Sequence, residues 1–227
     1  MTGVILQPSY IPWRGYFHLV QRADVFVFLD DAQYTTRDWR NRNIVKGAGG
    51  PRWITVPVIT KGRREQLIKD VEIDNSTAWR KSHLATLRHC YGQARYFDAY
   101  VGFLEEKYER TWDNLCELDI DLTCSIAGLL DIRTQFVRSS ELGASGAKTD
   151  RLIDICKRVG ITTYISGPSA KAYISPEAFE RESIELVYHS YDYPPYPQLF
   201  GEFAPNVTIL DLLFNCGSHS ATYIWNK

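Results

Sequence analysis

The chain has 227 residues, of which 44% are hydrophobic and 23% are charged. Its 26 lysines and arginines balance its 27 aspartates and glutamates, so no charge excess points to nucleic acid or a membrane surface as a partner. Its apolar stretches are far shorter than the roughly 18 residues that span a bilayer, and its N-terminus lacks the pattern of a signal peptide, so we expect a cytoplasmic protein with no membrane span.

The first third of the chain contains four short apolar runs that predict strands. They lie at residues 3–7, 25–29, 53–58 and 68–73. A helical pattern that begins near Pro12 separates the first two runs, which together predict a β-α-β unit. Residues 32–50 are polar and rich in arginine and asparagine. Their last part, 47–50, lacks the Lys-Ser/Thr of a P-loop and is interpreted as a flexible hairpin.

The rest of the chain predicts helical packing followed by a second β-α-β unit. Helices are predicted at 77–91, capped by Ser76 or Thr77, and at 96–108, 112–130, 150–159 and 208–214. Strands are predicted at 134–138, 163–166 and 184–188, with an aromatic, proline-rich loop at 191–197. We therefore predict one α/β domain over residues 1–227. Its sheet should be open and mainly parallel, of Rossmann-like or nucleotidyltransferase-like type, with a helical middle segment.

Polar residues follow three of the predicted strands. The first strand leads to Gln7, Ser9 and Tyr10, the second to Asp30, Asp31 and Gln33, and a later one to Ser166, Gly167, Ser169 and Lys171. Ligands of open parallel sheets bind outside the carboxyl ends of the strands, where the following loops gather. We therefore expect these residues to lie around a substrate.

Asp30 and Asp31 end a strand that is expected to be buried on both faces. Neighbouring side chains of a strand point to opposite sides, so at least one of the two carboxylates is expected to face the cleft. Such a carboxylate could bind a metal, a sugar hydroxyl or a substrate ammonium, and we assign a catalytic role to Asp30 and substrate binding to Asp31. The alternative is that the pair caps the following turn.

Residues 37–43 hold three arginines and two asparagines around Trp39. The forked donors of arginine suit phosphate or carboxylate groups, and the interleaved Trp39 favours a binding loop over a solvated one. Arg40, Asn41 and Asn43 are therefore predicted to contact the substrate.

The stretch 7–17 is comparable with the nucleotidyltransferase superfamily, in which an H-x-G-H motif opens the helix after the first strand. The aligned positions are Trp13-Arg14-Gly15-Tyr16, so both histidines that stabilise the transferred phosphate are absent. We expect Trp13 and Tyr16 to contact the substrate. Adenylyl transfer of that type is in doubt, since a fold can be shared without the reaction.

Two histidines are candidate general bases, because histidine changes its protonation state near neutral pH. His18 lies two residues beyond Tyr16 on the same predicted helix, and His189 follows the predicted strand 184–188. The competing interpretation of His18 is a partly exposed helical residue.

The cysteines are at positions 90, 116, 124, 156 and 216, and their spacing implies neither a disulfide framework nor a zinc site. Cys216 lies three residues before His219 and could act as a nucleophile beside its base. Catalytic pairs usually meet through the fold rather than along the chain, so a packed thiol is the favoured interpretation.

Five stretches together resemble the WbqC-like family over essentially the whole chain. They are I-L-Q-P-S-Y-I-P-W-R-G-Y-F at 5–17, F-L-D-D-A-Q-Y at 28–34, W-R-N-R-N-I-V-K at 39–46, Y-I-S-G at 164–167 and I-L-D-L-L-F-N-C-G at 209–217. The resemblance implies an enzyme of bacterial surface-polysaccharide biosynthesis, notably of O-antigen and modified amino sugars, or of natural-product biosynthesis. It suggests transfer of an acyl or aminoacyl group to the amine of a nucleotide-linked amino sugar.

Such a reaction needs a base, donors for the developing oxyanion and a groove for the donor. We assign these roles to His18 or His189, to the Ser166–Gly167 backbone with Gln7, and to the 37–43 loop. The donor would be a thioester of coenzyme A or of an acyl carrier protein. Two alternatives stay open: nucleotidyl transfer or ATP-dependent ligation on a degenerate H-x-G-H scaffold, and a non-catalytic ligand-binding module.

Overall fold

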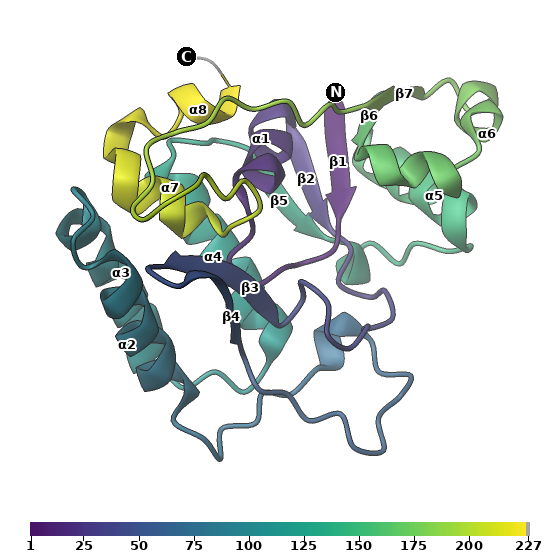
Figure 1. Cartoon of the computed structure of the whole chain (residues 1–227). Coiled ribbons are helices and arrows are strands. Elements are labelled where there is room, and N and C mark those ends of the chain that lie inside the picture. The colour runs from purple at the N-terminus through teal and green to yellow at the C-terminus, as the bar shows by residue number, and fades with distance from the viewer. Residues whose placement is uncertain (226–227) are drawn as a thin grey trace.

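A parallel sheet of five strands forms the centre of the molecule, as a computed structural model of residues 1–225 shows (Figure 1). The strands are β1 (Thr2–Leu6), β2 (Val25–Phe28), β5 (Gln135–Arg138), β6 (Thr163–Ser166) and β7 (Glu185–Tyr188). They lie in the order β5-β2-β1-β6-β7. In this doubly wound order, β2 and β5 are added on one side of β1, and β6 and β7 are added on the other, so the strand order reverses between β1 and β6. The predicted α/β fold with an open, mainly parallel sheet is confirmed.

Helices cover both faces of the sheet because its strands are apolar on both sides. Val4 and Phe26 point into a core shared with α1 (Arg14–Arg22), α4 (Leu115–Leu129) and α7 (Ile209–Cys216). Their neighbours Ile5 and Val25 point the other way, toward α5 (Lys148–Val159) and α6 (Pro176–Arg181). This alternation is the reason for the continuous apolar runs in the sequence.

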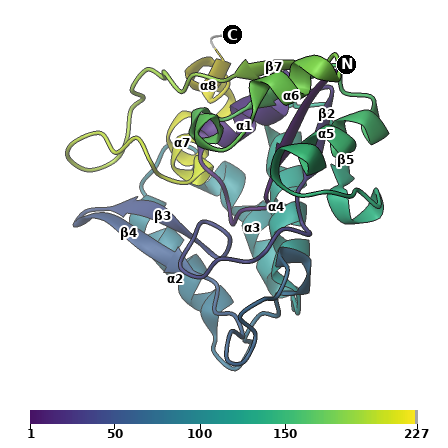
Figure 2. The same cartoon turned by 90° about the vertical axis from the view of Figure 1, so that its right-hand side faces the viewer.

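A second layer stands beyond the carboxyl ends of β1 and β2. It consists of the antiparallel hairpin β3 (Arg42–Gly47) and β4 (Gly50–Thr55), which packs on α2 (Trp79–Tyr91) beside α3 (Phe97–Glu109) (Figures 1 and 2). In both views the hairpin and α5 lie on opposite sides of the molecule, with the ends of β1 and β2 between them.

Several predicted elements differ in detail. Residues 68–73 are not a strand: Ile68–Asp70 is a 3-10 turn, and residues 72 and 73 make only isolated bridges. Their apolar pattern reflects burial of Ile68, Val71 and Ile73 in the core rather than a ladder. The strand β3 and the short helices α6 and α8 (Thr222–Trp225) were not predicted. Helix α2 begins after Ala78 without a side-chain cap, so the predicted Ser76 or Thr77 cap is wrong.

Candidate functional site

A cavity of about 1170 Å³ opens between the hairpin and α5, at the carboxyl ends of β1 and β2. Its polar lining residues are Gln7, Ser9, Asp31, Arg40, Asn43, Lys148, Arg151, Ser169 and Asn206. Its aromatic lining residues are Trp13, Tyr16, Trp39, Trp53, Tyr164, Tyr173 and Tyr191. The place is the one at which doubly wound sheets bind ligands, next to the reversal between β1 and β6. Seven residues singled out from the sequence as substrate contacts line it: Gln7, Ser9, Trp13, Tyr16, Asp31, Arg40 and Asn43.

Gln7 joins the two layers at the floor of the cavity. The Arg40 guanidinium donates to Gln7 Oε1, and the Tyr16 hydroxyl donates to the Gln7 carbonyl at 3.3 Å. The Trp13 indole packs closely on Gly15, where a Cβ would come within 2.3 Å of the ring, so only glycine leaves room for it. The first β-α loop therefore presents rings and an amide to the ligand in fixed positions.

The same loop has a strained backbone. Ile11 has a φ of 41°, a left-handed conformation that costs a β-branched residue about 1–3 kcal/mol. Asn43 Nδ2 donates to the carbonyls of Tyr10 (2.9 Å) and Ile11 (2.8 Å), and Thr208 Oγ1 donates to the Ile11 carbonyl at 2.8 Å. Side chains from the hairpin and from the start of α7 thus hold the loop in the shape that forms the cavity.

The two carboxylates at the end of β2 have different surroundings. Asp30 is buried and accepts from the Ser140 amide (2.9 Å) and from the hydroxyls of Ser139 (3.0 Å) and Ser140 (2.6 Å). It holds the turn after β5 and does not line the cavity. Asp31 lines the cavity, pairs with Arg151 of α5 and accepts from the Ser139 hydroxyl at 2.6 Å. The catalytic role predicted for Asp30 therefore falls to Asp31 in the proposal below.

A further carboxyl, Asp119 of α4, is fully buried and has no hydrogen-bond partner for either oxygen. Burial raises its pKa well above the usual value, against the opposing effect of the Arg40 cation. Burial thus favours the neutral form of Asp119, and Asp31 is the carboxylate that lines the cavity beside its cations.

Tyr10 and Asn41 point away from the cavity. The Tyr10 hydroxyl contacts Tyr108 and donates to His83 Nδ1 at 2.8 Å, since the other ring nitrogen of His83 donates to the Thr55 carbonyl at 3.1 Å. Asn41 donates to the Val56 carbonyl at 2.8 Å. Tyr10 thus joins the β1–α1 loop to α2 and α3, and Asn41 joins the two open ends of the hairpin; neither residue lines the cavity.

His18 and His189 also lie outside the cavity lining, in a group that we call the histidine network: Arg22, His18, His189 and Tyr193. Arg22 Nη1 is 3.0 Å from His189 Nδ1, and a guanidinium can only donate. His189 therefore carries its proton on Nε2 and donates to the Tyr193 hydroxyl at 3.1 Å, which in turn donates to His18 Nδ1 at 3.0 Å. Burial, with His18 and Arg22, lowers the pKa of His189 to about 4, and burial with Arg22 lowers the pKa of His18.

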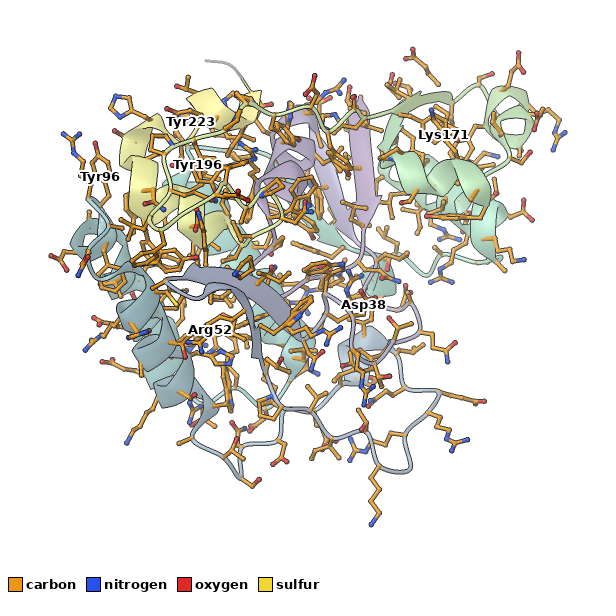
Figure 3. The ribbon with its side chains drawn as sticks, viewed as in Figure 1. Asp38, Arg52, Tyr96, Lys171, Tyr196 and Tyr223 are labelled. Atoms are coloured by element: carbon orange, nitrogen blue, oxygen red, sulfur yellow. The ribbon has the colours of Figure 1, made fainter. Side chains whose placement is uncertain are left out.

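Ser166 and Gly167, the predicted oxyanion donors, are covered by the loop after β7. A Cβ at Gly167 would come within 3.1 Å of the Tyr191 hydroxyl, and the Ser166 carbonyl accepts from the His189 amide at 2.9 Å. Ser169, two residues farther along, lines the cavity instead. Lys171, from the same predicted strand end, lies over the Tyr188 ring on the α5 and α6 side of the sheet (Figure 3).

At the positions of the H-x-G-H motif, the cavity receives rings in place of histidines. Trp13 and Tyr16 line it, while Arg14 is buried and donates to the carbonyls of Pro194 (2.8 Å) and Tyr223 (3.1 Å). Figure 3 shows Tyr223 beside Tyr196, over whose ring the Arg14 guanidinium lies at 5.1 Å. Arg14 thus anchors the last part of the chain.

Potential metal ligands and thiols also occur within residues 1–225. No three His, Cys, Asp or Glu side chains there gather in a way that could hold a metal ion. Cys216 is buried outside the cavity lining, and burial raises the pKa of its thiol to about 11, which does not favour a nucleophile. No helix in this part of the chain has the length and apolarity to cross a bilayer.

Sequence reasoning missed several cavity residues: Trp53, Lys148, Arg151, Tyr173 and Asn206. Two of them left a signal in the sequence. Lys148 and Arg151 are cations in the first turn of α5, where the helix dipole disfavours positive charge. A cation at that place is a reason to look for an anionic partner, which Asp31 provides for Arg151.

Comparisons with known proteins agree with the extent of the resemblance. A model of the WbqC-like protein family matches residues 7–223. An uncharacterized protein of Mycobacterium tuberculosis, Rv1507c, is 43% identical over 222 residues, which cover 97% of this chain and 96% of that protein. No solved structure matches the chain. The matched residues include both the hairpin and the α5 side of the cavity.

Proposed function

Because the chain belongs to the WbqC-like protein family, we propose that it is an enzyme of bacterial surface-polysaccharide or natural-product biosynthesis. It transfers an acyl or aminoacyl group to the amine of a nucleotide-linked amino sugar. The observation that carries the proposal is one cavity that combines the cations of Arg40, Lys148 and Arg151 with the carboxylate of Asp31. The cations suit the phosphates of a sugar nucleotide, and the carboxylate suits its amine.

The size of the cavity supports two substrates. Ligand pockets usually measure roughly 300–1,000 Å³, and this one has a volume of about 1170 Å³. Aromatic side chains such as Trp13 and Tyr191, whose rings pack with centroids 5.0 Å apart, form an apolar wall. A sugar and an acyl chain would both pack well on such a surface.

In the proposed reaction the amine nitrogen of the sugar attacks the thioester carbonyl. A C–N bond forms, the C–S bond breaks, and the proton that the nitrogen loses leaves with the thiol. Asp31 accepts a hydrogen bond from the amine and orients it, while the Lys148 ammonium and the Ser9 hydroxyl, both in the cavity lining, supply donors for the oxyanion. The donor is a thioester of coenzyme A or of an acyl carrier protein.

A second candidate is ATP-dependent ligation or nucleotidyl transfer. It is favoured by α5, whose first residues line the cavity and whose N-cap, Ala147, offers no side-chain acceptor to the first backbone N–H groups. Such a helix start suits a phosphate group. The rings of Trp13 and Tyr16 at the H-x-G-H positions argue against the phosphate chemistry of that motif.

The test is incubation with nucleotide-linked amino sugars and acyl thioesters, followed by mass spectrometry of the sugar nucleotide. A product heavier by one acyl group, together with one free thiol per product, is the expected result. Consumption of ATP with magnesium, and no product without it, would favour the second candidate. Tight binding of the sugar nucleotide with no product under either condition would indicate a non-catalytic binding module.

A further inference from the structure

The hairpin end of the cavity carries two exposed tryptophans. Trp39 and Trp53 are 41% and 46% exposed, their ring centroids are 5.1 Å apart, and both line the cavity. Hydrogen bonds fix the loop that holds Trp39. The Trp39 carbonyl accepts from the Tyr10 amide at 3.0 Å, and the Trp39 amide donates to the Asp38 carboxylate at 2.6 Å. Figure 3 shows Asp38 beyond the end of β1 and Arg52 on the hairpin. Two large rings are thus held at the opening without cover.

Positive charge gathers around these rings. Residues 32–64 contain eight lysines and arginines and a single acidic residue, Asp38, whereas the whole chain is nearly neutral. The Arg42 guanidinium lies over the Trp53 ring, 4.2 Å from its centroid, and it donates to the Arg37 carbonyl. Arg37 itself has a φ of 59°, an unfavourable conformation for a side-chain-bearing residue. Arg42 therefore packs directly on the tryptophan pair, and Arg37 and Arg40 belong to the same short loop, with Arg40 in the cavity lining.

We infer that the hairpin end binds a nucleoside diphosphate group, with the base stacked on Trp39 and Trp53 and the phosphates on Arg37, Arg40 and Arg42. The inference rests on the proposed function and assigns one part of its substrate to one part of the cavity. A base can stack on an exposed indole whatever its sequence identity, and arginine forks match phosphate oxygens. Asp38, the one acidic residue of this region, does not line the cavity, and its carboxylate accepts from the Thr35 hydroxyl at 2.7 Å and the Trp39 amide at 2.6 Å, so the three arginines outnumber the single negative charge beside them.

This placement orients the substrate. Asp31, Arg151 and Ser169 lie at the α5 end of the same cavity, so a nucleotide at the hairpin end directs the sugar and its amine toward Asp31. Nucleoside diphosphates occur in sugar nucleotides, in ATP and, with a further phosphate, in coenzyme A. The binding experiment must therefore compare these sources.

The experiment is a titration of the whole protein, in the absence of turnover, with UDP, ADP, coenzyme A and inorganic phosphate. Binding is followed by calorimetry and by quenching of tryptophan fluorescence. We expect at least one nucleotide to bind and quench, and the Trp39→Ala and Trp53→Ala variants to bind it about tenfold or more weakly. Trp39→Phe should retain most of the affinity because it keeps a stacking face. Arg42→Gln tests the proposed contact with the phosphates, and Arg88→Gln, which removes an exposed cation on α2, is its matched control.

The inference is overturned if no nucleotide binds, if inorganic phosphate binds as tightly as every nucleotide, or if the alanine variants bind like the wild type. The source with the highest affinity shows whether the hairpin end holds the sugar nucleotide or the coenzyme. If nucleotide binding depends on Trp39 but no acylated sugar forms, the inference stands and the proposed function fails. If acylation occurs and Trp39→Ala leaves the KM of both nucleotide-bearing substrates unchanged, the proposed function stands and the inference fails.

Discussion

Reactive side chains gather in two regions of the protein, and the two regions use them differently. In the histidine network the side chains are hydrogen-bonded to one another, and burial keeps both imidazoles neutral. In the cavity wall, Asp31, Arg40 and Lys148 line open space at the ends of β1 and β2. Asp31 and Arg40 also contact Arg151, Ser139 and Gln7, but a carboxylate and a guanidinium keep further hydrogen-bonding sites beyond these contacts. The comparison shows that residue type alone is a weak guide to a functional site. A better guide is whether the side chain can still form hydrogen bonds with a ligand.

The largest expected effect comes from removing the charge of the cavity carboxylate. Asp31→Asn keeps an acceptor for Ser139 but loses the negative charge that faces the substrate amine, so we expect kcat/KM for acyl transfer to fall about 100-fold or more. Steady-state kinetics with the sugar nucleotide measure this. Asp154→Asn on the outer part of α5, which pairs with Arg158, is the control. A fall of less than threefold would remove Asp31 from the mechanism.

The next effect concerns the support of the cavity wall. Asn43→Ala removes the side-chain donor to the buried carbonyl of Tyr10 and one of the two side-chain donors to the carbonyl of the strained Ile11. We expect the free energy of unfolding to drop by about 2–4 kcal/mol, measured by urea denaturation. Asn206→Ala, at the rim of the same cavity, should cost less than 1 kcal/mol. Equal losses in the two variants would show that Asn43 is an ordinary wall residue.

A pH titration of stability tests the buried imidazoles. Burial lowers the pKa of His83 and of His189 to about 4 in the folded protein, from the ordinary 6.5. The unfolded chain therefore takes up protons first as the pH falls, so the stabilisation is complete above about pH 6.5 and declines toward pH 4. Each histidine contributes at most about 2 kcal/mol of loss between pH 7 and pH 5. The same pH slope in His189→Gln as in the wild type would contradict this.

The smallest expected effect comes from a substitution in the histidine network. Tyr193→Phe removes the hydroxyl that joins His189 to His18, and we expect a loss of stability of about 1 kcal/mol with kcat changed less than twofold. Thermal unfolding and turnover are measured on the same preparation. A tenfold fall in kcat at unchanged stability would make the histidine network part of the catalytic machinery.

Periodicity and turn residues predicted the elements that depend on local pattern. The β1-α1-β2 unit has the predicted order, and α5 ends at Gly160, which adopts the left-handed conformation (φ 77°) expected of a helix-terminating glycine. The 3-10 turn at Ile68–Asp70 could not be predicted in this way. Its burial comes from packing against distant residues, and the apolar residues that this packing requires, Ile68, Val71 and Ile73, resemble the short apolar run of a strand.

The near wall of the cavity was predictable because it follows directly from strand ends. Gln7, Ser9 and Asp31 lie where a parallel sheet collects ligand contacts. The far wall was predicted only in part: Arg40 and Asn43 came from the polar loop at 37–43, whereas Trp53 and Asn206 reach the cavity through the hairpin and the C-terminal third of the chain. No local pattern reveals which distant segments meet, and the same reason explains why His18 and His189 could be recognised as reactive but not located.

The central position of β1 also governs the order in which the protein can assemble. β1 pairs with β2, which follows closely in the chain, and with β6, which is separated from it by more than half of the sequence. Thr208, far along the chain, closes the strained loop at Ile11. Contacts of such long sequence separation form slowly, so the cavity is completed late. Recovery of ligand binding during refolding should therefore lag behind recovery of helical signal, and would report the final step of folding.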